Sequence, residues 1–129
     1  MQTATSFDRL VLATRAIRHD PGCIDARLVL AEHSGDLSTR LRHLEAAVAA
    51  GEWLWGSVAE RVDHDLCWWG DVGTRPYMRA VQALGVALCE AGYPDESRAC
   101  FERLLIMNPN DNRCIRDLIR DLDIGPCSL

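Results

Sequence analysis

The stretch that decides the fold runs from Met78 to Asp111 and reads MRAVQALGVALCEAGYPDESRACFERLLIMNPND. Its apolar residues recur at helical spacing on both sides of a Gly-Tyr pair, and nowhere alternate as in a half-buried strand. Gly92 is the expected end of the first helix, because glycine readily adopts the left-handed conformation found there. Pro94 is expected to begin the second helix, and Asn108-Pro109 to end it. The stretch therefore predicts a hairpin of two antiparallel helices.

The same helical spacing continues on both sides of this hairpin. Asp36 is the expected N-cap of a helix that ends at Gly51, because its carboxylate can accept hydrogen bonds from free first-turn amides. Thr74 is the expected N-cap of the first hairpin helix. Residues 52–73 are less regular: they hold all four tryptophans, and predict a helix over about residues 54–62 followed by a loop. Elsewhere, helices are expected over about residues 4–18, 24–33, 37–50, 75–91, 94–107 and 111–123.

Composition narrows the class of protein. The chain has 129 residues, of which 48% are hydrophobic and 26% charged, as in one small globular domain. Fourteen arginines, no lysine and 19 acids give a net charge of −5, which argues against a broad nucleic-acid-binding face. No apolar run could span a bilayer, and Asp8, Arg9 and Arg15 interrupt the place of a secretory signal. We therefore expect a cytoplasmic protein that binds neither membranes nor nucleic acids.

The cysteines and histidines offer little for a metal site or an enzyme. Six cysteines form no CxxC pair, and we expect reduced, mostly buried thiols. His64 and Cys67 form an HxxC pair, but a zinc site needs four ligands and no second pair is present. The chain also has no nucleophile elbow, phosphate loop or HExxH motif. We expect no catalytic residue, metal or cofactor, and a small enzyme or metal-binding domain built on His64 and Cys67 is the alternative.

The decisive stretch fits a known repeat. In a 34-residue frame that closes at Pro109, Gly85 falls at position 8, Gly92 at position 15 and Phe101 at position 24. Those are the positions of the small crossing residue, the turn glycine and the large packing residue of the tetratricopeptide repeat. Residues 78–111 therefore resemble a tetratricopeptide repeat, with Val81 in place of the entry aromatic and Ser97 in place of an alanine.

The resemblance implies an all-α fold for the whole chain. The expected architecture is a right-handed superhelical array of antiparallel helix hairpins, closed by a C-terminal helix. Degenerate repeats would cover residues 4–51, an irregular tryptophan-rich segment residues 52–73, and the closing helix residues 111–123. The closing helix would bury its apolar face, which holds Ile115, Leu118, Ile119 and Leu122.

A narrower resemblance rests on two strings, WWGDVGTRPYMRA at residues 68–80 and LLIMNPNDNRCIRDL at residues 104–118. Both are similar to a family of poorly characterised bacterial tetratricopeptide-repeat proteins, whose usual pattern is WG-x-x-E-T-RPYMRA and then L-x-LNPNDNQG-x-RY. The chain departs from that pattern at Gly73, Arg113, Cys114 and Asp117. The resemblance implies a general adaptor role and supplies no catalytic residue.

In tetratricopeptide stacks the first helices line a concave groove, where a partner protein or peptide binds. The polar side chains expected to face it are Arg79, Gln82, Arg113, Arg116 and Arg120. Arginine holds carboxylates in bidentate geometry, which favours an acidic or C-terminal peptide. Arg79 and Arg113, one 34-residue period apart, are expected side by side with a guest carboxylate or Asp117 between them. Alternatively, the arginines lie on an outer face and pair with acids at helical spacing.

The tryptophans admit two interpretations as well. Large aromatic side chains are seldom left fully exposed, so core packing should account for at least half of the four. Trp68 and Trp69 are candidates for the rim of the groove, where an apolar partner segment would contact them. The expected function is thus protein–protein interaction, and self-association through leftover apolar surface at a terminal repeat is a further alternative.

Overall fold

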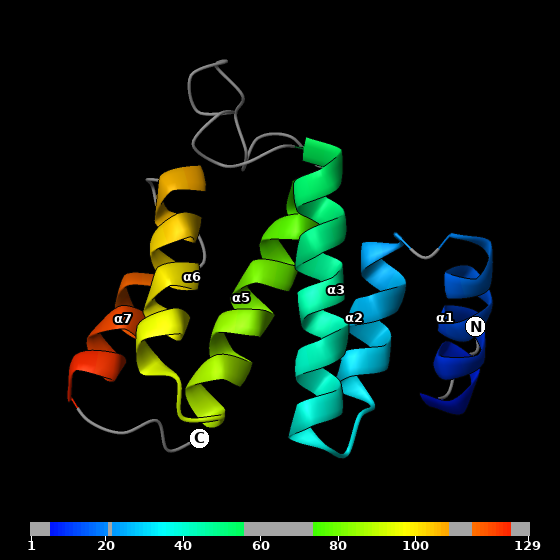
Figure 1. The fold of residues 1–129 in the computed structure, drawn as a ribbon, viewed down its shortest axis with the longest axis horizontal. Coiled ribbons are helices and arrows are strands. Elements are labelled where there is room, and N and C mark those ends of the chain that lie inside the picture. The colour runs from blue at the N-terminus through cyan, green and yellow to red at the C-terminus, as the bar shows by residue number, and fades with distance from the viewer. Residues whose placement is uncertain (1–5, 21, 56–73, 109–114, 125–129) are drawn as a thin grey trace, which may run out of the picture.

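The computed structural model describes residues 6–20, 22–55, 74–108 and 115–124. Within these ranges the protein forms six helices and no strand (Figure 1), which confirms the all-helical class. The helix expected over residues 54–62 lies almost wholly outside the described ranges. The helices are α1 (Ser6–His19), α2 (Ile24–Glu32), α3 (Leu37–Trp55), α5 (Arg75–Glu90), α6 (Pro94–Met107) and α7 (Ile115–Ile124).

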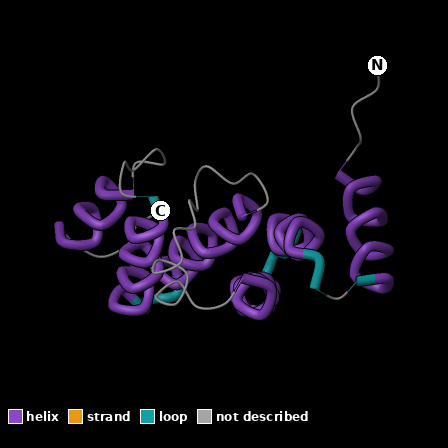
Figure 2. Tube along the Cα trace, turned by 90° about the horizontal axis from the view of Figure 1, so that it is seen from above, coloured by secondary structure: helices purple, strands orange, loops and turns teal. Residues whose placement is uncertain are grey.

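The helices pack mainly on their neighbours along the chain, from α1 at one end to α7 at the other (Figure 1). α2 and α3 form one antiparallel hairpin, and α5 and α6 form another. Seen from above, α2 and α5 lie in one layer, and α3 and α6 in the other (Figure 2). α2 also contacts α5, so the first helices of the two hairpins run side by side. None of the described helices combines the length and the apolar character needed to cross a membrane.

The start of α3 agrees with the sequence, whereas its end does not. An Asp36 carboxylate oxygen accepts hydrogen bonds from the Thr39 amide at 3.1 Å and the Thr39 hydroxyl at 2.9 Å, which confirms the predicted N-cap. The expected end at Gly51 is wrong, because α3 continues to Trp55. Gly51 is buried where a Cβ atom would overlap the ring of Tyr77. The glycine therefore permits a close helix crossing instead of ending a helix.

The α5–α6 hairpin has the crossing that the sequence predicts. A Cβ atom at Gly85 would lie 2.6 Å from Cε1 of Phe101, which is too close for the ring to stay in place. Ser97 lies fully buried beside the glycine, and its hydroxyl donates a 2.6 Å hydrogen bond to the Gly85 carbonyl oxygen. The packing roles expected of Gly85 and Phe101 are therefore confirmed.

The turn between these helices is confirmed too. Gly92 has a φ of 88°, the left-handed conformation that the sequence predicts there. The Tyr93 amide donates to the Leu88 carbonyl oxygen at 2.9 Å, and the Gly92 amide donates to that of Cys89 at 3.1 Å. This pair of hydrogen bonds is the Schellman arrangement, which satisfies the last carbonyl groups of the helix.

The core lies between α2, α3, α5 and α6, and α7 closes one side of it. Ile115 of α7 is buried, while its other three apolar residues, Leu118, Ile119 and Leu122, are partly buried against the core. At the opposite end, Ala13 of α1 and Ala26 of α2 are buried but do not belong to the main core cluster. The two ends of the array are therefore anchored differently.

Three cysteines lie in the described ranges. Cys23 and Cys100 have free thiols, as expected, and burial raises the pKa of the Cys100 thiol. The expectation is wrong at Cys89, which is disulfide-bonded. Its apolar helical surroundings suggested a buried thiol, but hydrophobic spacing carries no information about the oxidation state of sulfur.

Candidate binding groove

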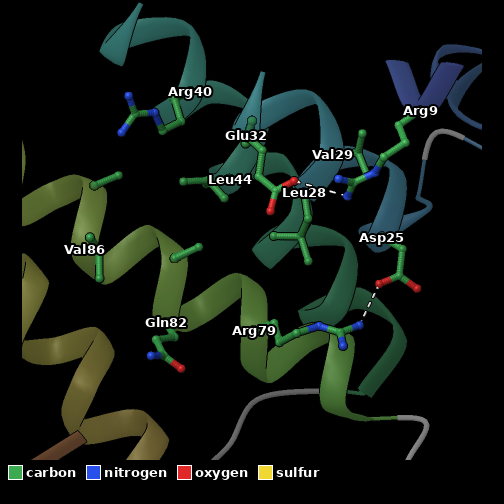
Figure 3. A pocket seen from close by; sticks show the side chains of 13 residues that line it. Arg9, Asp25, Leu28, Val29, Glu32, Arg40, Leu44, Arg79, Gln82 and Val86 are labelled. Carbon is green, nitrogen blue, oxygen red and sulfur yellow. Dashed lines mark hydrogen bonds and ion pairs between the residues drawn. The ribbon is translucent and has the colours of Figure 1, made fainter. Parts of the chain in front are cut away.

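A cavity of about 670 Å³ lies between α2 and α5, with α1 and the start of α3 contributing to its walls (Figure 3). Its floor is aliphatic and its rim is charged or polar. The floor includes Leu28, Val29, Leu44, Ala83, Val86 and Ala87. The rim consists of Arg9, Asp25, Glu32, Arg40, Arg79 and Gln82. We call this cavity the groove.

Helical periodicity explains why these residues meet. On α5, residues 79, 82, 83, 86 and 87 line the groove at steps of three, one, three and one, which is one face of a helix. On α2, residues 25, 28, 29 and 32 repeat the same pattern. Because α2 and α5 lie side by side, two similar faces border one depression, each with a charged residue at its start and both aliphatic and polar residues after it.

The charges of the rim form exposed ion pairs (Figure 3). Arg79 Nη2 donates to Asp25 Oδ1 at 2.8 Å and joins α5 to α2. Arg9 Nη2 donates to Glu32 Oε2 at 3.3 Å and joins α1 to α2. The side chains of Arg79 and Asp25 are 49% and 65% exposed, and such exposed pairs contribute only about 0–1 kcal/mol each.

Arg40 sits at the far end of the groove, where its Nη1 donates to Glu90 Oε2 at 2.8 Å. Among the described residues, the contacts of Arg9, Arg40 and Arg79 each involve a single guanidinium nitrogen. A guanidinium group has five N–H donors arranged as a planar fork. The three arginines of the rim therefore retain hydrogen-bonding capacity for a carboxylate from outside.

The structure brings part of the predicted site together. Arg79 and Gln82 line the groove. Arg116 and Arg120 are exposed on α7, outside its lining, and Arg120 contacts Asp117 at 3.5 Å across one helical turn. For Arg120, the structure thus matches the alternative interpretation of a surface arginine paired with an acid. Three further predicted residues lie outside the described ranges: Arg113, Trp68 and Trp69.

Sequence reasoning missed the α2 side of the groove. The carboxylate beside Arg79 belongs to Asp25, whereas the sequence pointed to a guest or to Asp117. Asp25 precedes Arg79 by 54 positions, which is no multiple of the predicted 34-residue period, so that period could not relate the two residues. The sequence did contain one indication of this wall: in α2, Asp25 is followed at helical spacing by the aliphatic residues Leu28 and Val29.

The remaining candidates offer less chemistry. Among the described residues, no three His, Cys, Asp or Glu side chains cluster as a metal site would require. A raised pKa makes Cys100 a poor nucleophile, because the thiolate is the reactive form. Trp53 is 87% exposed, so this tryptophan is not part of the core. His64 and Cys67, the basis of the enzyme alternative, lie outside the described ranges.

Comparison of the chain with protein-family models, curated proteins and solved structures finds no match. The resemblance to tetratricopeptide repeats therefore stays a prediction from sequence. The case for a binding function rests on the groove itself.

Proposed function

We propose that the protein is an interaction module that binds a peptide segment of another protein in the groove. The observation that carries this proposal is the aliphatic floor enclosed by a charged rim between two parallel helices. Apolar cavities with a few placed polar groups are typical of binding sites, and 670 Å³ lies within their usual range of about 300–1,000 Å³.

The fold supports the same proposal. Gly85, Phe101 and Gly92 perform the packing and turn roles that the repeat frame assigns to their positions. A tetratricopeptide-like array would present its first helices on a concave side, and α2 and α5 are the first helices that border the groove. On this proposal the chain acts as an adaptor without chemistry of its own.

Blocking the floor tests this function. Ala83 is partly buried in the groove, so Ala83→Trp should fill the cavity and abolish binding to arrays of short aliphatic peptides. Ala49→Trp is the matched control, because Ala49 is exposed on α3 outside the groove lining. We expect both variants to remain folded by circular dichroism and only Ala83→Trp to lose the peptides. Equal binding by both variants, or none by the wild-type protein, would contradict the proposal.

A further inference from the structure

We propose that Arg79 recognises a side-chain carboxylate of the bound segment and that Asp25 is an internal competitor which occupies Arg79 while the groove is empty. The inference rests on the proposed function, and it specifies the chemistry of the partner. In the free protein the Asp25 carboxylate already provides what a guest would provide, a carboxylate oxygen 2.8 Å from a guanidinium nitrogen.

The groove is less acidic than the chain as a whole. Each of its three arginines is paired with one acid, Asp25, Glu32 or Glu90, whereas the whole chain has a net charge of −5. The Arg79–Asp25 contact is a single hydrogen bond between exposed side chains, so separating the two costs little. A guest carboxylate can instead bind the guanidinium fork in bidentate geometry, which is stronger than the single contact it replaces.

Among the three arginines of the rim, Arg79 is the one held in place by the core. Its sequence neighbours Met78 and Ala80 are fully buried, so α5 presents the side chain from a fixed backbone. Fixed presentation lowers the entropy that binding must overcome. Arg40 and its partner Glu90 are less exposed, at 34% and 30%, and a guest reaches them less easily. Arg9 lies on the terminal helix α1.

The position of Arg79 also determines how close the acidic residue of the guest must be to its aliphatic residues. Arg79 is in the first turn or two of α5, and the aliphatic floor extends from it toward Val86. Seven helical residues span about 10 Å, because the rise is about 1.5 Å per residue. An extended peptide covers that distance in about three residues. The inferred guest is therefore an extended segment with an acidic residue next to a short aliphatic run.

Two fluorescein-labelled peptides with blocked termini test this inference. Both contain leucine and alanine, and they differ only in an Asp or an Asn beside the aliphatic run. Fluorescence anisotropy should show that the wild-type protein prefers the Asp peptide. Asp25→Asn should tighten the binding of the Asp peptide several-fold and leave the Asn peptide unchanged. Arg79→Gln should remove the preference between the two peptides.

Asp117→Asn is the matched control, because it also removes one exposed acid beside an arginine but lies outside the groove. It should bind both peptides as the wild-type protein does. Equal tightening by Asp25→Asn and Asp117→Asn, or no preference for Asp over Asn, overturns the inference while binding itself upholds the proposed function. Failure of both peptides to bind any variant overturns both proposals. A third peptide, which carries Asn and a free C-terminus, tests a terminal carboxylate. If only this peptide binds more tightly to Asp25→Asn than to the wild-type protein, the assignment of a side-chain carboxylate is wrong.

Discussion

The α5–α6 hairpin and the α1–α2 pair each consist of two consecutive helices, yet they differ in the size and burial of the side chains that lie between them. Phe101 closes over Gly85 in the main core, and the side chains at this crossing are almost completely buried. In the other pair, Ala13 of α1 and Ala26 of α2 are buried outside the main core, and the exposed Arg9–Glu32 ion pair joins the two helices. Figure 2 shows α1 inclined to the axes of α2 and α3 at the edge of the array.

The difference concerns the groove directly, because α5 forms one of its walls and α1 contributes Arg9 to its rim. The α2 and α5 walls belong to the core, whereas the position of Arg9 depends on small side chains and one surface ion pair. Small side chains bury little apolar area, so they contribute less stability than the aromatic crossing. We therefore expect rigid walls on α2 and α5 beside a rim at α1 that is easier to displace.

The largest expected effect comes from removing the aromatic ring. Phe101→Ala should lower the free energy of unfolding by about 3–5 kcal/mol, because it leaves a cavity in the core. Leu12→Ala on α1 should change it by less than about 0.5 kcal/mol, since Leu12 is 59% exposed. Urea denaturation of both variants measures the contrast. Losses of similar size would mean that the two regions are equally well anchored.

The second effect comes from adding a methyl group where the helices cross. Gly85→Ala should destabilise the protein by about 1–3 kcal/mol through overpacking against Phe101. Gly35→Ala is the control, because a Cβ atom there would have no neighbour within 4 Å. In a Phe101→Leu background the cost of Gly85→Ala should shrink, because the ring atoms it would meet are gone. An unchanged cost in that background would contradict the crossing.

A smaller effect is expected from the hydrogen bond at the same crossing. Ser97→Ala removes the hydroxyl that donates to the Gly85 carbonyl oxygen, and should cost about 1 kcal/mol. Ser38→Ala, on the exposed part of α3, should be nearly neutral. Thermal unfolding monitored by circular dichroism compares the two. If Ser97→Ala is neutral as well, the hydrogen bond from Ser97 to Gly85 does not contribute to stability, which contradicts the prediction.

The smallest effect is a dependence of the free energy of unfolding on pH, through His43 of α3. The pKa of His43 is lowered below its ordinary value of 6.5, mainly by burial and to a smaller extent by the charges of Arg27 and Arg42. The unfolded chain therefore takes up a proton at a higher pH than the folded protein. The stability that neutral His43 provides is complete above about pH 6.5 and is lost as the pH falls through the lowered value.

Urea denaturation between neutral and mildly acidic pH measures this loss, and His43→Gln should reduce it. The N-cap Asp36 acts in a separate window, because hydrogen bonds from Thr39 lower its pKa from 3.8. Its contribution is lost only at more acidic pH, as the pH falls below that value. A wild-type protein whose stability is constant across the histidine range would contradict the assigned shift.

The sequence predicted the helices and the α5–α6 crossing because local features encode both. Glycine, proline and capping residues indicate where helices begin and end, and Gly85, Gly92 and Phe101 lie within one predicted hairpin of 34 residues. The predicted helix end at Gly51 was wrong because the sequence does not distinguish a glycine inside a helix from one that follows it. The distinction depends on the Tyr77 ring, which packs against Gly51 in the folded protein. Position in sequence alone cannot show which neighbour approaches a glycine.

The candidate site was predicted only in part for a related reason. Arg79 and Gln82 followed from the first-helix pattern of a single repeat. Asp25 did not follow, because its position beside Arg79 depends on how α2 and α5 align in space, and the 54 positions between them do not match the predicted 34-residue period. Contacts between hairpins depend on such register, which hydrophobic spacing does not reveal.

Mapping of amide chemical shifts by NMR, on addition of the blocked Asp peptide, tests directly whether the groove is the binding site. We expect the largest changes on the groove faces of α2 and α5, around Leu28, Val29, Ala83 and Val86. The outer faces of α3 and α6 should change little. Changes centred on those outer faces, or none at saturating peptide, would contradict the claim that the groove is the binding site.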